Sequence, residues 1–127
     1  MVTQRFKASE AAINDNILYF NMTEVFKNFN GLRDSERMLV DSDNLSFIYI
    51  LDSEAGFVYI DFPEQTWSSL KEMLDKDLEA VLQAENNEVI KLSAIKQELQ
   101  YLVHNIEGNT NYGEEMMKEV EKNFLNE

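Results

Sequence analysis

The chain has no cysteine, one histidine, one proline and four glycines among its 127 residues. The missing cysteines exclude disulfides, thiolate zinc sites and cysteine nucleophiles, and they fit a reducing compartment. The single histidine, His104, excludes any pair of histidines working together within one chain. Because His104 also adjoins the apolar stripe of a predicted helix, we interpret it as a boundary residue and expect it to be dispensable. The sequence therefore predicts no catalytic residue, metal ligand or cofactor.

Long apolar runs and basic residues are also scarce. No run approaches the length that spans a membrane, and the first ten residues, MVTQRFKASE, lack the apolar core of a signal peptide. Only 11 Lys and Arg oppose 24 Asp and Glu, which gives a formal charge of −13. Such a charge repels nucleic acids and anionic membranes, so we expect neither as a partner. These features predict a cytoplasmic protein with an acidic surface.

The apolar content is nevertheless high enough for a folded core. Hydrophobic residues make up 44% of the chain and aromatic residues 11%, which is more than disordered chains carry. No linker, repeat or low-complexity segment divides the sequence, and its length suits one core. We therefore expect residues 1–127 to form a single α+β domain.

The segment 38–67 organises the predicted fold, because two runs of β-branched and aromatic residues flank a short polar loop at residues 53–56. If this loop has four residues, Asp52 pairs with Phe57. A three-residue loop with Gly56 in a bulge would shift the pairing by one residue and mix the two faces. The four-residue loop separates the faces more cleanly. It gives a core face made of Phe47, Tyr49, Leu51, Val58, Ile60 and Phe62.

The opposite face of this hairpin needs a cover. In the preferred pairing it carries four large apolar side chains, Ile48, Ile50, Phe57 and Tyr59, which form a patch of the size that marks contact sites. The N-terminal segment could fold across them. A second copy of the chain could instead cover them through a two-fold interface. Both alternatives stay open, and the four residues are the candidate interface with a protein partner or a second copy.

Further strands are predicted on either side of this hairpin. Turn residues at Asn14-Asp15-Asn16 predict a hairpin within residues 2–20, and residues 80–92 predict another around a polar turn. Residues 32–37 are interpreted as a polar loop that leads into a short strand at 38–40. Residues 23–30 fit a helix or a strand.

Three helices are predicted after the central hairpin. Pro63 suits a first helical turn, with Trp67 on the buried stripe of that helix. Ser93 can cap a second helix, whose apolar residues recur at helical spacing. Asn111 begins a third, which we expect to lie antiparallel to the second. The sequence thus predicts a mostly antiparallel sheet, built from hairpins and covered on one face by about three helices.

Two polar segments could bind ions. Residues 41–44 open like a calcium loop, but Leu45 occupies a ligand position and no glycine follows at the sixth place. We therefore favour a tight turn in which Asp41, Asp43 and Asn44 bond local backbone groups. The loop 108–113 could hold an anion at a helix N-terminus. Two glutamates follow it and would repel an anion, so capping and chain reversal are favoured.

Three stretches, MLVDSDN at 38–44, EQTW at 64–67 and NIEGNTNYG at 105–113, resemble a family of small acidic proteins of low-GC Gram-positive bacteria. The match runs in the same order from residue 38 nearly to the C-terminus, whereas residues 22–37 look less like the family. That family has no assigned function. The resemblance implies a bacterial cytosolic protein and brings no catalytic or binding residues.

Three functions of different class follow. The leading hypothesis is a non-enzymatic binding or regulatory module that presents an acidic surface to a protein partner or to itself as a homodimer. The second is a small-molecule-binding protein with a pocket between the aromatic hairpin and the Trp67 helix. The third is a hydrolase or metal enzyme built on Asp and Glu alone. Without a catalytic signature, the sequence favours a non-enzyme.

Overall fold

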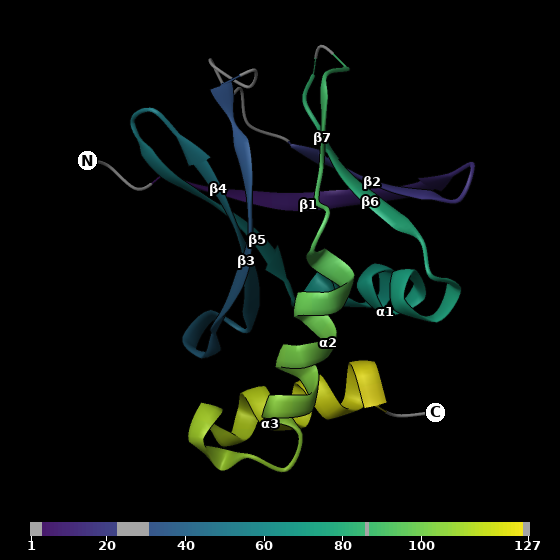
Figure 1. The fold of residues 1–127 in the computed structure, drawn as a ribbon. Coiled ribbons are helices and arrows are strands. Elements are labelled where there is room, and N and C mark those ends of the chain that lie inside the picture. The colour runs from purple at the N-terminus through teal and green to yellow at the C-terminus, as the bar shows by residue number, and fades with distance from the viewer. Residues whose placement is uncertain (1–3, 23–30, 86, 126–127) are drawn as a thin grey trace.

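A seven-stranded sheet with strand order β3-β4-β5-β1-β2-β6-β7 frames the fold in the computed structural model, which describes residues 4–22, 31–85 and 87–125 (Figure 1). The strands are β1 (Gln4–Asn14), β2 (Ile17–Met22), β3 (Arg33–Asp41), β4 (Ser46–Ser53), β5 (Gly56–Pro63), β6 (Glu79–Gln83) and β7 (Val89–Lys91). The helices are α1 (Trp67–Lys76), α2 (Ile95–Ile106) and α3 (Glu114–Val120). All three helices contribute side chains to one core with the sheet.

The sheet is mixed, so the prediction is confirmed only as α+β. Four strand pairings are antiparallel among the described residues, and two are parallel, joining β1 to β5 and β2 to β6. The three predicted hairpins are present, but parallel pairing links them to one another. These links join strands far apart in the sequence, where the alternation within each strand does not specify a neighbour.

Strand β1 pairs with β5 over its first part and with β2 over its second part, with a register shift between the two parts. Its first part pairs with β5 in parallel, from Gln4 opposite Val58 onward, and its second part pairs with β2 in the N-terminal hairpin. The register shifts between Ala8 and Glu10, which is where a β-bulge bends a strand. The predicted turn closes this hairpin. Asp15 and Asn16 both have positive φ, as a two-residue hairpin turn requires.

The central hairpin has the predicted pairing. Asp52 lies opposite Phe57, and Ser53 lies opposite Gly56. The six predicted core residues are at most 1% exposed. The alternation therefore identified both the pairing and the core face.

The helices cover this core face through an aromatic cluster. The ring centroid of Trp67 lies 5.2 Å from that of Phe47 and 5.6 Å from that of Phe124. Its indole Nε1–H donates to the carbonyl of Phe62 at 3.0 Å. A 3₁₀ turn at residues 64–66 follows Pro63, and α1 begins at Trp67, so the predicted helix starts later than expected. A π-helical turn, Glu121–Leu125, carries Phe124.

The predicted polar loop at residues 32–37 is wrong. Most of it belongs to β3, which pairs with β4 on both sides of a register shift between Asp34 and Arg37. Glu36 has a φ of 59° within this irregularity. The segment is polar because β3 is an edge strand, where charged residues and bulges discourage further pairing. Helix α2 also covers part of this edge, since Glu98 accepts from the Met38 N–H at 3.3 Å.

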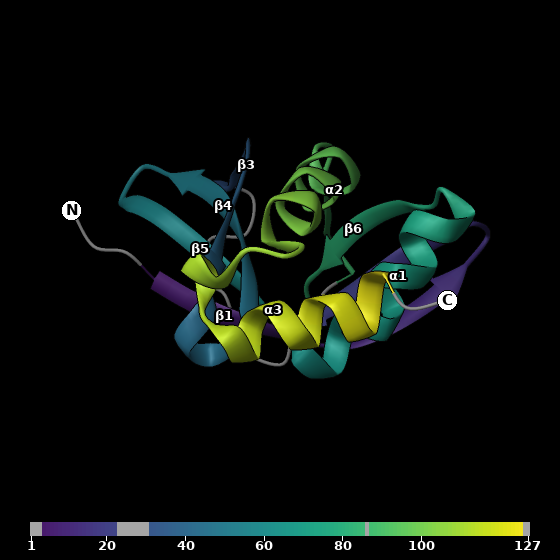
Figure 2. The same cartoon turned by 90° about the horizontal axis from the view of Figure 1, so that it is seen from below.

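Helices α2 and α3 are not the antiparallel pair that we predicted. Both views show α3 crossing near the end of α2 at a steep angle (Figure 1, Figure 2). The connection between them, residues 107–113, contains a 3₁₀ segment, Thr110–Tyr112. Asn109 caps this 3₁₀ segment by accepting from the Asn111 N–H at 3.0 Å. Helix α3 begins after Gly113 without a side-chain cap, so the predicted start at Asn111 is wrong. In the part of the chain described here, no helix has the length and apolarity to cross a bilayer. The prediction for residues 23–30 lies outside the described residues.

Candidate functional site

The candidate interface lies on the outer face of the sheet, opposite the core. Ile48 and Ile50 share this face with Phe57 and Tyr59, because alternate residues of a strand point to the same side. Ile48 is only 2% exposed and Ile50 8%, whereas Phe57 and Tyr59 are half-buried. The apolar patch open to a partner is therefore smaller than expected. The interface itself stays a prediction.

An arginine from β1 lies across this face. Arg5 pairs in register with Tyr59 of β5, and its Nε donates to Asp61 Oδ2 at 2.7 Å. Its Nη2 reaches Asp41 Oδ2, at the end of β3, at 2.6 Å. The guanidinium thus bridges two carboxylates that lie on strands β5 and β3, with β4 between them. The N-terminal segment covers the outer face through a side chain, while its backbone extends the sheet.

The two carboxylates keep Arg5 charged and oriented. Hydrogen bonds to Asp61 and then to Asp41 raise the pKa of Arg5 above its usual value. The pKa of Asp41 is lowered, first by a hydrogen bond from the Asn44 side chain, at 2.7 Å, and then by Arg5. Asp61 is 5% exposed and also accepts from the Ser46 hydroxyl at 3.4 Å. Arg5 itself is 39% exposed, so its guanidinium is fixed in place and yet accessible.

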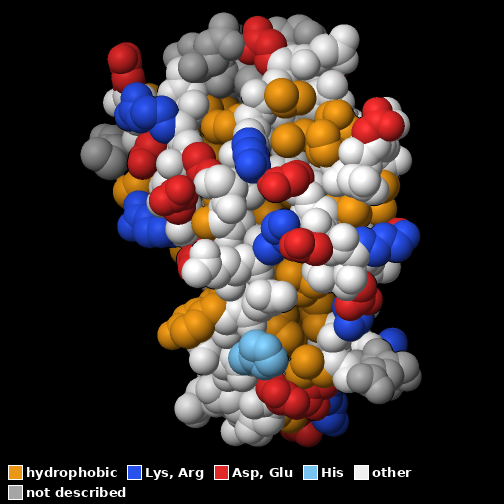
Figure 3. Space-filling view, turned by 45° about the vertical axis from the view of Figure 1, so that its right-hand side comes forward, with side chains coloured by type: hydrophobic (Ala, Val, Ile, Leu, Met, Phe, Trp, Pro, Cys, Tyr) orange, Lys and Arg blue, Asp and Glu red, His pale blue; other side chains and the backbone are white. Residues whose placement is uncertain are grey.

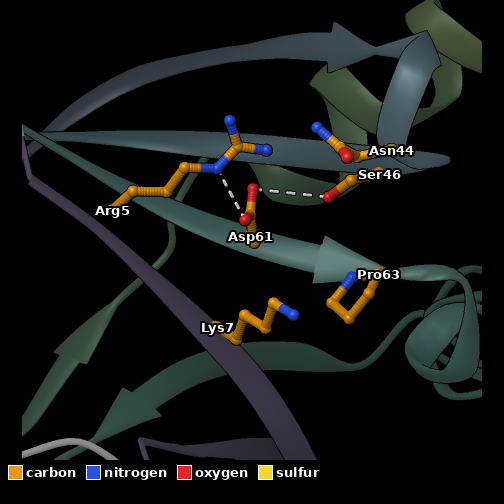
Figure 4. Close-up of a pocket in the computed structure, with 6 residues that line it drawn as sticks. All are labelled: Arg5, Lys7, Asn44, Ser46, Asp61 and Pro63. Atoms are coloured by element: carbon orange, nitrogen blue, oxygen red, sulfur yellow. Dashed lines mark hydrogen bonds and ion pairs between the residues drawn. The ribbon is translucent and has the colours of Figure 1, made fainter.

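A groove of about 570 Å³ lies beside this arginine and is lined by Arg5, Lys7, Asn44, Ser46, Asp61 and Pro63. Ser46 and Asp61, both buried, form its floor. Figure 4 shows Lys7 reaching from β1 toward Pro63, while Arg5 extends over Asp61 toward Asn44 and Ser46. The predicted tight turn at residues 41–44 is a 3₁₀ segment, and Leu45 leaves it in the left-handed conformation. This turn places Asn44 at the rim of the groove.

Lys7 differs from most other lysines of the chain. Lys71, Lys76, Lys91, Lys96 and Lys118 each form an ion pair with an acidic residue. Lys7 lies opposite Asp61 in register, but the Asp61 carboxylate bonds Arg5 and Ser46 instead. Within the described part of the chain, Lys7 has no hydrogen bond or ion pair. An exposed, uncompensated cation therefore stands next to a fixed one.

A second polar cluster lies at the start of α2. Asp34 accepts from the Tyr49 hydroxyl at 2.5 Å and from the backbone N–H and hydroxyl of Ser93. Burial favours a higher pKa for Asp34, but these hydrogen bonds outweigh it and hold the pKa below its usual value. Burial and then the bond to Asp34 raise the pKa of Tyr49. Such a carboxylate is a weak base, so this cluster serves to anchor α2 to β3 and β4.

The remaining candidates of the sequence lie apart from the groove. His104 is exposed in the last turn of α2 and has no hydrogen bond or ion pair among the described residues. Figure 3 shows it on the surface (pale blue). No group of three or more acidic or histidine side chains in the described chain is arranged to hold a metal. In the segment proposed as a calcium loop, Asp41 bonds Arg5 and Asn44.

Sequence reasoning missed the groove. Arg5 and Lys7 are two residues apart in a strand, so their shared face could have been predicted from the alternation in VTQRFKA. Their neighbour could not, because the parallel pairing of β1 with β5 is not a local feature. The residues that line the groove come from the N-terminal strand, the turn at residues 41–44 and the central hairpin.

Comparisons place the chain among known sequences. A family model described as "Family of unknown function (UPF0738)" matches residues 6–124. A UPF0738 protein of Bacillus mycoides is 39% identical over 121 residues, covering 95% of this chain and 98% of its own. A UPF0738 protein of Bacillus cereus is 46% identical over 95 residues, covering 75% of this chain and 76% of its own. No solved structure matches significantly.

Proposed function

Because the chain belongs to the UPF0738 family, whose function is unknown, we propose its function from its geometry: it is a non-enzymatic binding protein that holds a small molecule in the outer-face groove. The observation that carries this proposal is Arg5, which is fixed by two carboxylates and remains accessible at the groove. An arginine that bonds Asp61 and Asp41 keeps its orientation without a ligand, so little conformational freedom is lost on binding.

The size and floor of the groove support a small ligand. Its volume of about 570 Å³ lies within the range of about 300–1,000 Å³ that is usual for small-molecule sites. Its buried floor residues, Ser46 and Asp61, are polar and hydrogen-bonded to each other. Such a floor offers directional contacts, which give a site its specificity.

The groove is not at the position of the predicted pocket, which was between the aromatic hairpin and the Trp67 helix. The space between the hairpin and α1 is filled by Phe47, Trp67 and Phe124. The groove opens on the opposite side of the same hairpin, at its Pro63 end. Phe57 and Tyr59, half-buried on this outer face, are the proposed contact for a protein partner or a second copy once the groove is occupied.

The surface charge also favours a local site over a broad acidic dock. On the face shown in Figure 3, acidic side chains alternate with Lys and Arg instead of forming one acidic field. Several charged side chains of the described chain form ion pairs, such as Lys96 with Asp77 at 2.8 Å. We propose that the protein acts in the bacterial cytoplasm, which its lack of cysteine fits.

A thermal-shift screen against a metabolite panel tests the proposed function. A ligand present at about 100 times its Kd stabilises the folded state by about 2.7 kcal/mol. The variant Asn44→Trp places a large side chain in the groove, from an exposed position. The matched control, Gln100→Trp, adds the same side chain to the exposed side of α2.

We expect a ligand that stabilises the wild type and Gln100→Trp but not Asn44→Trp. Ligands that stabilise all three proteins equally would place binding elsewhere on the molecule. A panel without any stabilising compound would leave the groove without a small-molecule role and reject the proposal.

A further inference from the structure

We propose that the groove recognises an oxyanion, a phosphate or carboxylate group of the small molecule, through Arg5 and Lys7. This inference rests on the proposed function, because it names the chemical group that the groove binds. It comes from the balance of hydrogen-bond donors and acceptors around the groove.

Arg5 has donors to offer. A guanidinium carries five N–H donors in a planar fork. Two of its nitrogens are engaged, Nε with Asp61 and Nη2 with Asp41. Nη1 has no partner in the described part of the chain. Its N–H groups can therefore donate to an oxyanion without breaking the bonds that hold Arg5 in place.

Lys7 adds a second cation on the same face. Arg5 and Lys7 project from alternate positions of β1, and the groove touches both side chains. Asp61 is turned toward Arg5 and Ser46, which leaves the Lys7 ammonium without a described partner. An ammonium is a common phosphate-binding group, and it donates three hydrogen bonds.

The carboxylates at the groove already have donors of their own. Asp61 Oδ2 accepts from Arg5 at 2.7 Å, and Asp61 Oδ1 lies 3.4 Å from the Ser46 hydroxyl, whose single proton it shares with the Phe47 carbonyl at 3.2 Å. Asp41 accepts from Arg5 and from the Asn44 side chain. A cationic ligand would meet the positive charges of Arg5 and Lys7, whereas an anionic one would meet donors that have no partner among the described residues. The groove therefore selects for a ligand that supplies acceptors.

The oxyanion also fits the local charge. The chain as a whole carries −13, which repels anions at a distance. Charges beyond about 8–10 Å are largely screened at physiological salt, so the contacts at the groove decide the affinity. There, both carboxylates pair with Arg5. An incoming anion meets Nη1 of this arginine and the Lys7 ammonium, which have no partner among the described residues.

The test is a titration of the isotope-labelled full-length protein, followed by amide NMR at constant ionic strength. Inorganic phosphate is the first probe, succinate the second, and chloride the reference salt. The variant Lys7→Ala removes an exposed cation, so its fold should persist. The matched control, Lys76→Ala, removes an exposed cation on α1.

We expect phosphate or succinate to give saturable shifts at residues 5–7, 44–46 and 61. Lys7→Ala should weaken this binding about tenfold or more, as the loss of a charge-assisted hydrogen bond implies. Lys76→Ala should leave it unchanged. Saturation by phosphate alone assigns the group as phosphate, and saturation by succinate alone assigns it as carboxylate.

Two outcomes overturn the inference. Shifts that merely follow the reference salt, or that weaken equally in both variants, would exclude an oxyanion site. A thermal-shift ligand that is lost in Asn44→Trp but retained in Lys7→Ala would show that the groove binds a group other than an oxyanion. In that case the proposed small-molecule binding stands, and only the assignment of the bound group as an oxyanion is wrong.

Discussion

The Tyr49 hydroxyl donates to Asp34 Oδ1 at 2.5 Å, while the other oxygen of the same carboxylate accepts from Ser93 at the start of α2. Tyr49 is fully buried in the core of β4. Asp34 therefore joins the edge strand β3, the central strand β4 and helix α2 at one point. Asp34 lies opposite Leu51, a residue of the core face, so its side chain is on the side of the sheet that α2 covers.

Asp34→Ala should lower the free energy of unfolding by about 2–3 kcal/mol, because it removes the acceptor of a buried hydroxyl and of the helix-start donors. Asp34→Asn should cost less, since it keeps one acceptor oxygen. Urea denaturation measures both. The control is Asp43→Ala, at an exposed position in the 41–44 turn. Equal effects of Asp34→Ala and Asp43→Ala would contradict the anchoring role.

The same carboxylate makes stability dependent on acid. The pKa of Asp34 lies below its usual value of 3.8, so the folded state favours the ionised form. This contribution is fully present above the pKa of the unfolded chain, and it is lost as pH falls through the lower pKa of the folded state. The stability difference between the wild type and Asp34→Asn should therefore shrink below about pH 4. A difference that stays constant from pH 7 to pH 3 would contradict this assignment.

Glu64 shows the opposite dependence. A hydrogen bond with the Glu119 carboxyl, then burial, raises the pKa of Glu64 above its usual 4.5, and Lys122 only partly offsets this. A raised pKa means that the stabilisation from the shared proton is present at low pH and lost as pH rises through the folded-state value. Glu119→Gln should therefore raise the urea midpoint at pH 7 more than at pH 4.5. Glu54→Gln, at an exposed hairpin position, should change both equally.

Trp67→Ala should cost about 3–5 kcal/mol of unfolding free energy, as a large-to-small change in a packed core. The side chain is fully buried, contacts two aromatic rings and donates to Phe62. Tyr101→Ala, where the residue is 65% exposed, should stay within about 0.5 kcal/mol. Thermal or urea melts compare the two. An unshifted melt for Trp67→Ala would place this tryptophan outside the cooperative core.

Ile48→Glu should unfold the protein instead of separating a dimer. Ile48 is 2% exposed within one chain, so the change buries an unpaired charge. Val89→Glu is the control, because Val89 is 51% exposed. Circular dichroism measures whether each variant is folded, and light scattering measures its molar mass. A dimeric wild type that becomes a folded monomer in Ile48→Glu would instead support the two-fold interface.

Ile48 and Leu51 show which features of the fold can be predicted from the sequence and which cannot. Alternation places each on its correct face, because neighbouring strand residues point to opposite sides. It also predicts the burial of Leu51, since the hairpin has one consistent core face. It does not predict that Ile48 is buried, because which side chains lie over the outer face depends on pairings between strands that are distant in the sequence, such as β1 with β5.

The same limit explains the candidate site. The pairing of Asp52 with Phe57 follows from a local turn, and local turns have recognisable residues. The pairing of Lys7 with Asp61 is parallel and distant, and no residue type in either strand specifies it. The groove is formed by that distant pairing. Alternating apolar and polar residues predict a strand. They do not predict which strand lies beside it in the sheet, and so they do not predict which side chains line the groove.

The divided strand β1 also has a consequence for how the chain folds. Gln4 is synthesised well before Val58, with which it pairs, and β2 is synthesised well before β6, its parallel partner. Such non-local pairings have high contact order and slow the folding reaction. The N-terminal hairpin must therefore wait on the ribosome until both later hairpins have emerged. Leu18 and Phe20 of this hairpin are buried in the finished sheet. During that interval they are exposed and can bind chaperones.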